Sequence, residues 1–155
     1  MGKRSLEITA VSSPLKAAFA ISRGAKTSAE TIRVSLREGG AEGRGECVPY
    51  GRYGETVDGV IATIEQVRAE LEAGMSRAEL QNRLPAGAAR CAIDCALWDL
   101  EAKQAGIPVW KLAGLPEPKP LETAVTVSLD TPEAMAAVAK ATAGPAAVSM
   151  VSRNA

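Results

Sequence analysis

The spacing of apolar residues changes near residue 56, and this change constrains the fold more than any other feature of the sequence. Before it, polar residues separate Ile32, Val34 and Leu36 one at a time. Such alternation is typical of a strand with one buried face. After Thr56 the apolar residues fall at steps of three and four, which is typical of a helix with one buried face. We therefore expect an early sheet followed by helices, in an α+β fold.

The first fifty residues are expected to form an antiparallel three-stranded meander. Short alternating stretches at 5–16 and 16–24 fit strands, and residues 30–38 fit a half-buried strand. The pair Gly39-Gly40 is expected to make a turn, after which residues 42–48 return along the sheet.

Three helices are expected to follow the meander. The first begins after an N-cap at Thr56 and ends near Gly74. The pair Ser76 and Glu79 forms a capping box that opens a short helix, which Pro85 stops. Residues 86–106 form a third helix rich in small residues, several of which would let a neighbouring element approach closely: Ala88, Ala92, Cys95 and Ala96. Pro108 opens a further helical turn.

A stiff segment, "EPKP" at 117–120, predicts a boundary between a domain at 1–116 and a second domain at 121–155. The second domain begins with a strand at 121–129 and a helix that Thr131 caps and Gly144 ends. One strand and one helix are the opening unit of an α/β domain, and they cannot bury a sheet alone. We therefore expect the second domain to be cut short, with no apolar strand of comparable quality in residues 145–155.

The composition excludes several classes of function. Eighteen basic and eighteen acidic residues cancel, which argues against nucleic acid or an anionic membrane as partner. The absence of histidine excludes Ser-His and Cys-His nucleophile pairs and histidine metal ligands. No signal-peptide pattern or membrane span is recognisable, and three cysteines make an odd number. These features favour a cytoplasmic protein with reduced thiols.

The stretch "GRGECVPYGRYGET" at 43–56 concentrates glycines and tyrosines. It lacks the Gly-Lys-Ser/Thr of a Walker loop and the third glycine of a dinucleotide-binding turn. Two interpretations stay open, a tight connection from strand to helix or a loop with a function.

Other candidate residues have simpler structural interpretations. Cys91 and Cys95 are expected to be small buried core residues, because no further ligand cluster supports a metal site. Three carboxylates of the third helix are expected to be partly exposed helix charges or helix-end pairs rather than catalytic groups: Asp94, Asp99 and Glu101. Two aromatic residues are expected to anchor the core, Trp98 and Trp110. Arg23 is either a solvated side chain or a two-point ligand for a carboxylate.

Four segments together resemble the amino-terminal region of enolase-superfamily enzymes. They are "FAISRGAKTSAE", "GRGECVPYGRYGET", "AARCAIDCALWDLEAKQAGIPVWKLAGL" and "ETAVTVSLDTPEAM". The muconate-lactonizing subgroup is most similar, and within it the dipeptide epimerases of the L-Ala-D/L-Glu type. The resemblance covers roughly residues 4–144 and is carried mainly by "PYGRYGET" followed by "AIDCALWDL".

This resemblance implies an enolase-like capping domain followed by the first βα unit of an incomplete TIM barrel. Two loops of the cap, around Arg23 and at 43–56, would close over the substrate. Arg23 would bind the distal carboxylate of an acidic dipeptide, and Thr126 would lie at the mouth of the barrel. The sequence leaves open whether the protein forms a homo-oligomer.

The family removes a proton beside a carboxylate, with Mg²⁺ stabilising the enolate and lysines as the bases. The resemblance places the lysines and the metal-binding carboxylates on later barrel strands, so it implies no catalytic residue and no metal ligand in this chain. The chain alone is expected to be inactive, and the tail suggests a truncated or frame-shifted product. The open alternatives are the cap of a cycloisomerase or o-succinylbenzoate synthase, and a non-catalytic module that pairs with a separate barrel chain.

Overall fold

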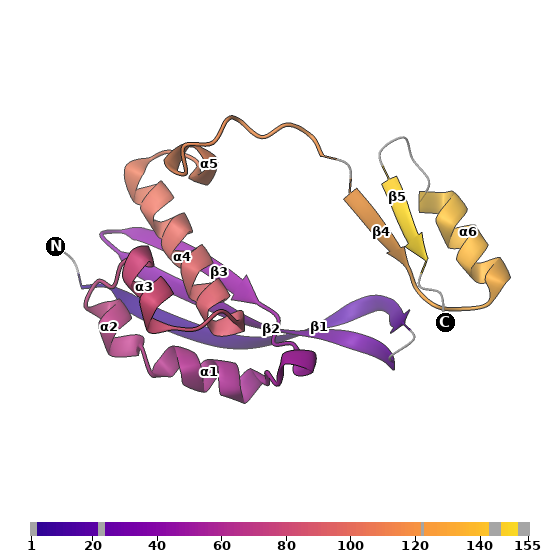
Figure 1. Cartoon of the computed structure of the whole chain (residues 1–155), viewed down its shortest axis with the longest axis horizontal. Helices are drawn as coiled ribbons and strands as arrows, with labels where there is room; N and C mark the ends of the chain where they lie inside the picture. Colours follow the sequence, from indigo (N-terminus) through magenta and orange to yellow (C-terminus); the bar gives the residue numbers. More distant parts are fainter. Residues whose placement is uncertain (1–2, 22–23, 122, 143–146, 152–155) are drawn as a thin grey trace. The chain divides into compact units, whose positions relative to one another are not determined.

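The computed structural model describes residues 3–21, 24–121, 123–142 and 147–151 (Figure 1). The chain forms two compact units. The first unit comprises Met1–Ser13 and Glu30–Glu117, and the second comprises Pro14–Ala29 and Pro118–Ala155. The second unit thus combines part of the first thirty residues with the segment that follows the linker.

A three-stranded antiparallel sheet opens the chain, as predicted. Its strands are β1 (Ser5–Ile21), β2 (Gly24–Glu38) and β3 (Ala41–Cys47), in the order β1-β2-β3. The two stretches predicted at 5–16 and 16–24 belong mainly to the one continuous strand β1. The register pairs Val34 with Gly45 and Leu36 with Gly43, so buried β2 residues lie beside the glycines of β3.

The helices of the first unit follow the predicted order, with one difference. They are α1 (Val57–Glu65), α2 (Arg68–Glu72), α3 (Arg77–Arg83), α4 (Ala88–Ala105) and α5 (Val109–Leu112), preceded by the 3₁₀ helix η1 (Gly51–Tyr53). The prediction of one helix from 57 to 74 is wrong, because the chain tightens at Val67, whose N–H donates to the Ile64 carbonyl. Apolar spacing continues across this break, since Ile64, Val67 and Leu71 are all buried.

Local capping signals are confirmed. The Thr56 hydroxyl accepts a hydrogen bond from the Gly59 N–H at 3.1 Å. Ser76 and Glu79 form the reciprocal capping box at the start of α3. Helix α4 ends at Gly106, which takes the left-handed conformation with φ 66°. These short-range interactions depend only on neighbouring residues, which is why the sequence reveals them.

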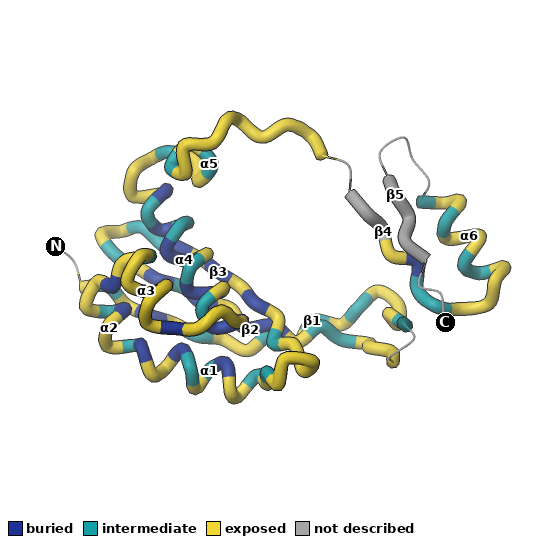
Figure 2. Tube along the Cα trace, in the orientation of Figure 1, coloured by how far each residue is buried: buried dark blue, intermediate teal, exposed yellow. Residues whose placement is uncertain are grey.

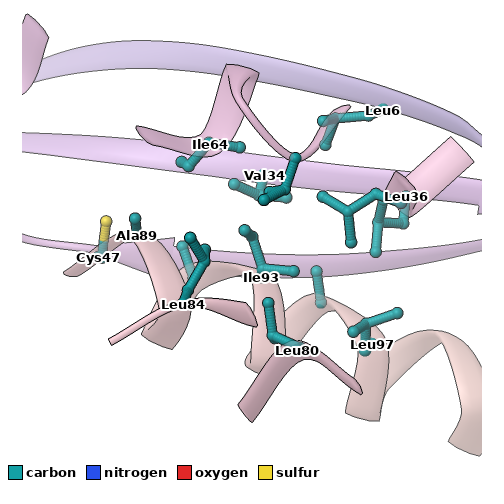
Figure 3. Close-up of a cluster of buried hydrophobic side chains, with 14 of the residues drawn as sticks. Leu6, Val34, Leu36, Cys47, Ile64, Leu80, Leu84, Ala89, Ile93 and Leu97 are labelled. Atoms are coloured by element: carbon teal, nitrogen blue, oxygen red, sulfur yellow. The ribbon is translucent and has the colours of Figure 1, made fainter. Parts of the chain in front are cut away.

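The core of the first unit lies between the sheet and the helices (Figure 2). Figure 3 shows buried side chains of the strands, such as Val34 and Leu36, meeting Ile93 and Leu97 of α4. Helix α4 approaches β3 closely, because a Cβ on Gly43 or Gly45 would overlap the backbone of α4 at Ala92 and Ala96. We call these four residues the glycine–alanine seam.

The second unit contains a parallel pair of strands, β4 (Thr123–Val127) and β5 (Ala147–Val151), with α6 (Pro132–Thr142) between them in sequence. The Thr131 hydroxyl accepts from the Ala134 N–H, as expected of an N-cap. No apolar strand of comparable quality was expected in residues 145–155, whereas the structure has β5 at Ala147–Val151. The short "AVSMV" segment has a weak pattern alone, and pairing with β4 supplies the hydrogen bonds that make it a strand. Gly144, the predicted end of the helix, lies outside the described residues.

None of the described helices combines the length and the apolar character that crossing a bilayer requires.

Candidate functional site

The loop between β3 and α1 presents several exposed apolar side chains. It comprises residues 48–56, which is shorter than the predicted 43–56, because residues 43–47 belong to β3. Val48 is 55% exposed and Tyr53 is 76% exposed. The Tyr50 and Tyr53 rings lie with their centroids 5.6 Å apart, at an angle of 51°. The loop thus presents a pair of aromatic rings and a valine on its surface.

Glu55 ties this loop to the start of α4. One carboxylate oxygen accepts from the Ala88 N–H at 2.7 Å, and the other accepts from the Tyr50 N–H at 2.9 Å. These hydrogen bonds, the one from Ala88 being the stronger, lower the pKa of the Glu55 carboxyl. The sequence alone does not reveal this role of Glu55, because its partner Ala88 lies 33 residues away in the chain.

An open hollow of about 440 Å³ lies between the loop and α4. Val48, Tyr50 and Tyr53 line it from the loop, and Ala88 and Cys91 line it from the helix. Its surface is mostly apolar, with the Glu55 carboxylate at one side. The hollow can therefore accept an apolar group more readily than a phosphate, which agrees with the absence of a Walker pattern.

The glycines at 43 and 45 have a packing role. Both lie in β3, facing α4 across the glycine–alanine seam. Of the small residues predicted to allow a close approach, Ala92 and Ala96 make it, whereas Cys95 does not contribute because it is exposed.

The prediction that Cys91 and Cys95 are buried is wrong, because both are exposed. They lie on the face of α4 opposite the residues that meet the sheet, such as Ile93 and Leu97. Cys47 is the buried cysteine, and its burial raises the pKa of the thiol to about 11. Within the part of the chain that the structure describes, no group of three or more Cys, Asp or Glu residues could hold a metal ion.

The carboxylates of α4 form the structural pairs that the sequence predicted. Asp99 accepts from the Lys103 ammonium at 2.6 Å and from the Arg44 N–H at 2.8 Å. Glu101 forms an ion pair with Arg77, and Asp94 accepts from the Gln81 amide. The Asp99–Lys103 pair lies within α4, and the other contacts hold α4 to β3 and to α3.

The two tryptophans are half-buried, so their assignment as core anchors is wrong. The Arg77 guanidinium lies over the Trp98 ring, 3.3 Å from its centroid. The Arg77 guanidinium thus contacts both the face of an aromatic ring and the Glu101 carboxylate.

The predicted site residues of the second unit are only partly described. Arg23 lies outside the described residues. Thr126 is exposed and is the penultimate residue of β4, where it pairs with Met150 of β5. Directly after β4, the Leu129 N–H donates to the Ala20 carbonyl at 2.9 Å and the Ser128 hydroxyl donates to the Ala18 carbonyl at 3.3 Å. These two bonds connect the residues directly after β4 to the last part of β1.

Comparison with known proteins gives one family. Residues 3–114 match the model of the mandelate racemase / muconate lactonizing enzyme N-terminal domain. The chain is 48% identical over 123 residues to the L-Ala-D/L-Glu epimerase of Escherichia coli K12, covering 79% of this chain and 38% of that protein.

Two solved structures have the same fold. One is an enolase family member of Agrobacterium tumefaciens with homology to dipeptide epimerases, with bound sodium, L-Ala-L-Glu and an ordered loop. It is 46% identical, with a TM-score of 0.82, over 87% of this chain and 41% of that one. The other is a dipeptide epimerase of Cytophaga hutchinsonii with Mg and D-Ala-L-Val, 30% identical, with a TM-score of 0.76, over 90% and 40% of the two chains.

The chain spans about two fifths of the length of these relatives. The family model covers most of the sequence, and the observed sheet and helices match the enolase-type capping domain that the resemblance implied. The chain therefore belongs to the mandelate racemase / muconate lactonizing enzyme family of the enolase superfamily, and it carries the N-terminal domain of that family.

Proposed function

We propose that this chain is the capping and substrate-specificity region of a dipeptide epimerase that acts on an acidic dipeptide of the L-Ala-D/L-Glu type. The observation that carries the proposal is the 48% identity with the Escherichia coli epimerase of that name. The similarity to a structure that holds L-Ala-L-Glu supports it. In this assignment residues 1–116 form the cap and residues 121–155 begin the barrel domain. A homo-oligomeric assembly stays a prediction.

The cap would recognise the dipeptide, and the reaction would exchange the proton on the carbon beside a carboxylate. Arg23 would bind the distal carboxylate through two N–H donors, and Thr126 would lie beside the substrate at the carboxyl end of β4. Loop 48–56 would cover the substrate with Val48, Tyr50 and Tyr53, the apolar side chains that it already presents.

The Mg²⁺ that the family implies, and that the Cytophaga structure holds, does not fit the described residues of this chain. Several of their carboxylates accept hydrogen bonds or form ion pairs with Arg, Lys or backbone N–H groups, and no three of them together could hold a metal ion. We therefore assign recognition to this chain and derive no catalytic step within it.

A chimera tests the proposal. Residues 4–144 replace the matching segment of the Escherichia coli enzyme, and proton exchange of L-Ala-L-Glu is followed in heavy water, with the 155-residue chain alone assayed beside it. We expect exchange by the chimera within about tenfold of the parent enzyme, and background exchange by the chain alone. An inactive but folded chimera, or turnover by the chain alone, would contradict the proposal.

The same chimera tests Arg23. Loss of a two-point contact to a carboxylate typically weakens binding by about tenfold to a hundredfold, so Arg23→Ala should raise the KM for L-Ala-L-Glu by that amount. The control is Arg83→Ala, which removes an exposed α3 arginine paired with Glu70 and should leave KM unchanged. An unchanged KM in the Arg23 variant would remove this residue from the site.

A further inference from the structure

Loop 48–56 has little internal structure to hold it in place. Its backbone hydrogen bonds within the loop are those of η1, from the Tyr53 N–H to the Tyr50 carbonyl and from the Gly54 N–H to the Gly51 carbonyl. Its large side chains are exposed, so side-chain packing contributes little to its position. Some other contact has to determine where Tyr50 and Tyr53 lie.

The Glu55 carboxylate supplies such a contact, because it binds two backbone N–H groups that are far apart in sequence. The Tyr50 N–H belongs to the loop, and the Ala88 N–H is the first of α4, where it has no partner within the helix. A carboxylate at this end of a helix also interacts favourably with the helix dipole. The same side chain thus completes the start of α4 and fixes the loop to it.

The chain leaves room for this carboxylate at Gly87. A Cβ at that position would lie 3.1 Å from the nearer Glu55 oxygen, closer than ordinary van der Waals contact. Helix α4 is itself held against β3 by the glycine–alanine seam, so the support to which Glu55 binds is rigid. The position of the loop is therefore set by the sheet, through α4 and Glu55.

We propose that Glu55 is a positioning residue for substrate binding, which holds Tyr50 and Tyr53 in a preformed loop by bridging the backbone of Tyr50 and Ala88. This assignment rests on the proposed function, in which loop 48–56 covers the dipeptide. The Glu55 carboxylate contacts the backbone N–H groups of Tyr50 and Ala88. Its effect on the substrate is therefore exerted through the tyrosines. Preformation of a binding loop lowers the entropy that substrate binding would otherwise lose.

We call the Glu55 bridge between the backbones of Tyr50 and Ala88 the anchor, and amide hydrogen exchange of the 155-residue chain tests it directly. In Glu55→Ala both acceptors are lost, and we expect the Tyr50 and Ala88 amides to exchange at least about tenfold faster, because each loses a hydrogen bond to a charged acceptor. The isosteric Glu55→Gln keeps one acceptor oxygen and should accelerate at least one of these amides. Native exchange at Tyr50 and Ala88 in both variants would overturn the proposal.

A matched control is available in Glu79, which accepts from the Ser76 N–H at 2.8 Å at the start of α3. Glu79→Gln should accelerate exchange at Ser76 and leave Tyr50 and Ala88 unchanged. This control separates loss of the anchor from a general loss of stability after removing a helix-capping carboxylate.

The chimera tests the role in binding. Glu55→Gln should raise the KM for L-Ala-L-Glu about threefold to tenfold with kcat within twofold, whereas a purely structural role would lower the active fraction and leave KM unchanged. An unchanged KM beside faster amide exchange would overturn the positioning role. If the chimera with native Glu55 is inactive, the proposed function fails and amide exchange alone decides whether Glu55 is the anchor.

Discussion

The two units of the chain are held together in different ways. In the first unit, strands and helices share a continuous set of buried side chains, and α4 contacts β3 without intervening side chains at the seam. In the second unit, α6 has no buried residue, and Val127 is the single buried residue among those whose burial is described. Backbone pairing of β4 with β5 is the main described contact there. Side-chain packing thus specifies the first unit, whereas in the second unit the described residues show mainly the backbone pairing of β4 with β5.

The largest expected effect comes from filling the seam. Gly45→Val places side-chain atoms where the α4 backbone lies, and since overpacking typically costs about 1–3 kcal/mol, this backbone overlap should reach at least the upper end of that range. Urea unfolding followed by circular dichroism measures it. The control is Gly51→Ala, because a Cβ at Gly51 meets nothing within 4 Å and its φ is not positive. Equal stability of the two variants would contradict the seam.

The same substitution in one helix of each unit tests the comparison more finely. Val60 of α1 is 4% exposed and Val138 of α6 is 47% exposed. Val60→Ala should cost about 2 kcal/mol, from two lost methylene equivalents and a small cavity, while Val138→Ala should stay within about 0.5 kcal/mol. Local stability from amide exchange in each unit provides the measurement. A larger effect at Val138 would show that α6 is packed more tightly than its exposure indicates.

The smallest expected effect on stability near neutral pH comes from the titration of the buried cysteine. At pH 8 an alkylating reagent should modify Cys91 and Cys95 well before Cys47, which is buried and has a pKa raised to about 11. The folded state then binds the Cys47 proton more tightly than the unfolded state does. This contribution to stability is fully present below about pH 9 and is lost as the pH rises from about 9 to 11. Cys47→Ser, measured by thermal unfolding across that range, should remove this part of the pH dependence.

The sequence was most informative where structure depends on near neighbours. The alternation of Ile32, Val34 and Leu36, the Thr56 cap and the Ser76–Glu79 capping box all act within a few residues, and each was confirmed. The order of strands and helices follows from these signals together with the change of apolar period.

Features that depend on distant partners could not be predicted. Periodicity alone does not reveal the break at Val67, since the apolar pattern continues through it. The exposure of Cys91 and Cys95 depends on which face of α4 meets the sheet. The role of Glu55 depends on Ala88, and a glutamate directly before a helix cap gives no sign of such a partner. At the candidate site, therefore, the resemblance supplied Arg23 and Thr126, and the structure supplied Glu55.

The glycine–alanine seam also restricts how α4 can slide along β3. A screw displacement of α4 by one residue, about 100° of rotation with about 1.5 Å of rise, would bring Ile93 and Leu97 to the places that Ala92 and Ala96 now occupy. Neither side chain would fit against β3 at Gly43 or Gly45, where even a Cβ overlaps the α4 backbone. The alignment of α4 on β3 is thus determined by the absence of side chains at Gly43 and Gly45, and not by an attractive contact. Loop 48–56 begins three positions after Gly45 and is bonded to the start of α4 through Glu55. A mutation that shifts α4 along β3 would therefore also displace Tyr50 and Tyr53, although every residue of the loop would be unchanged.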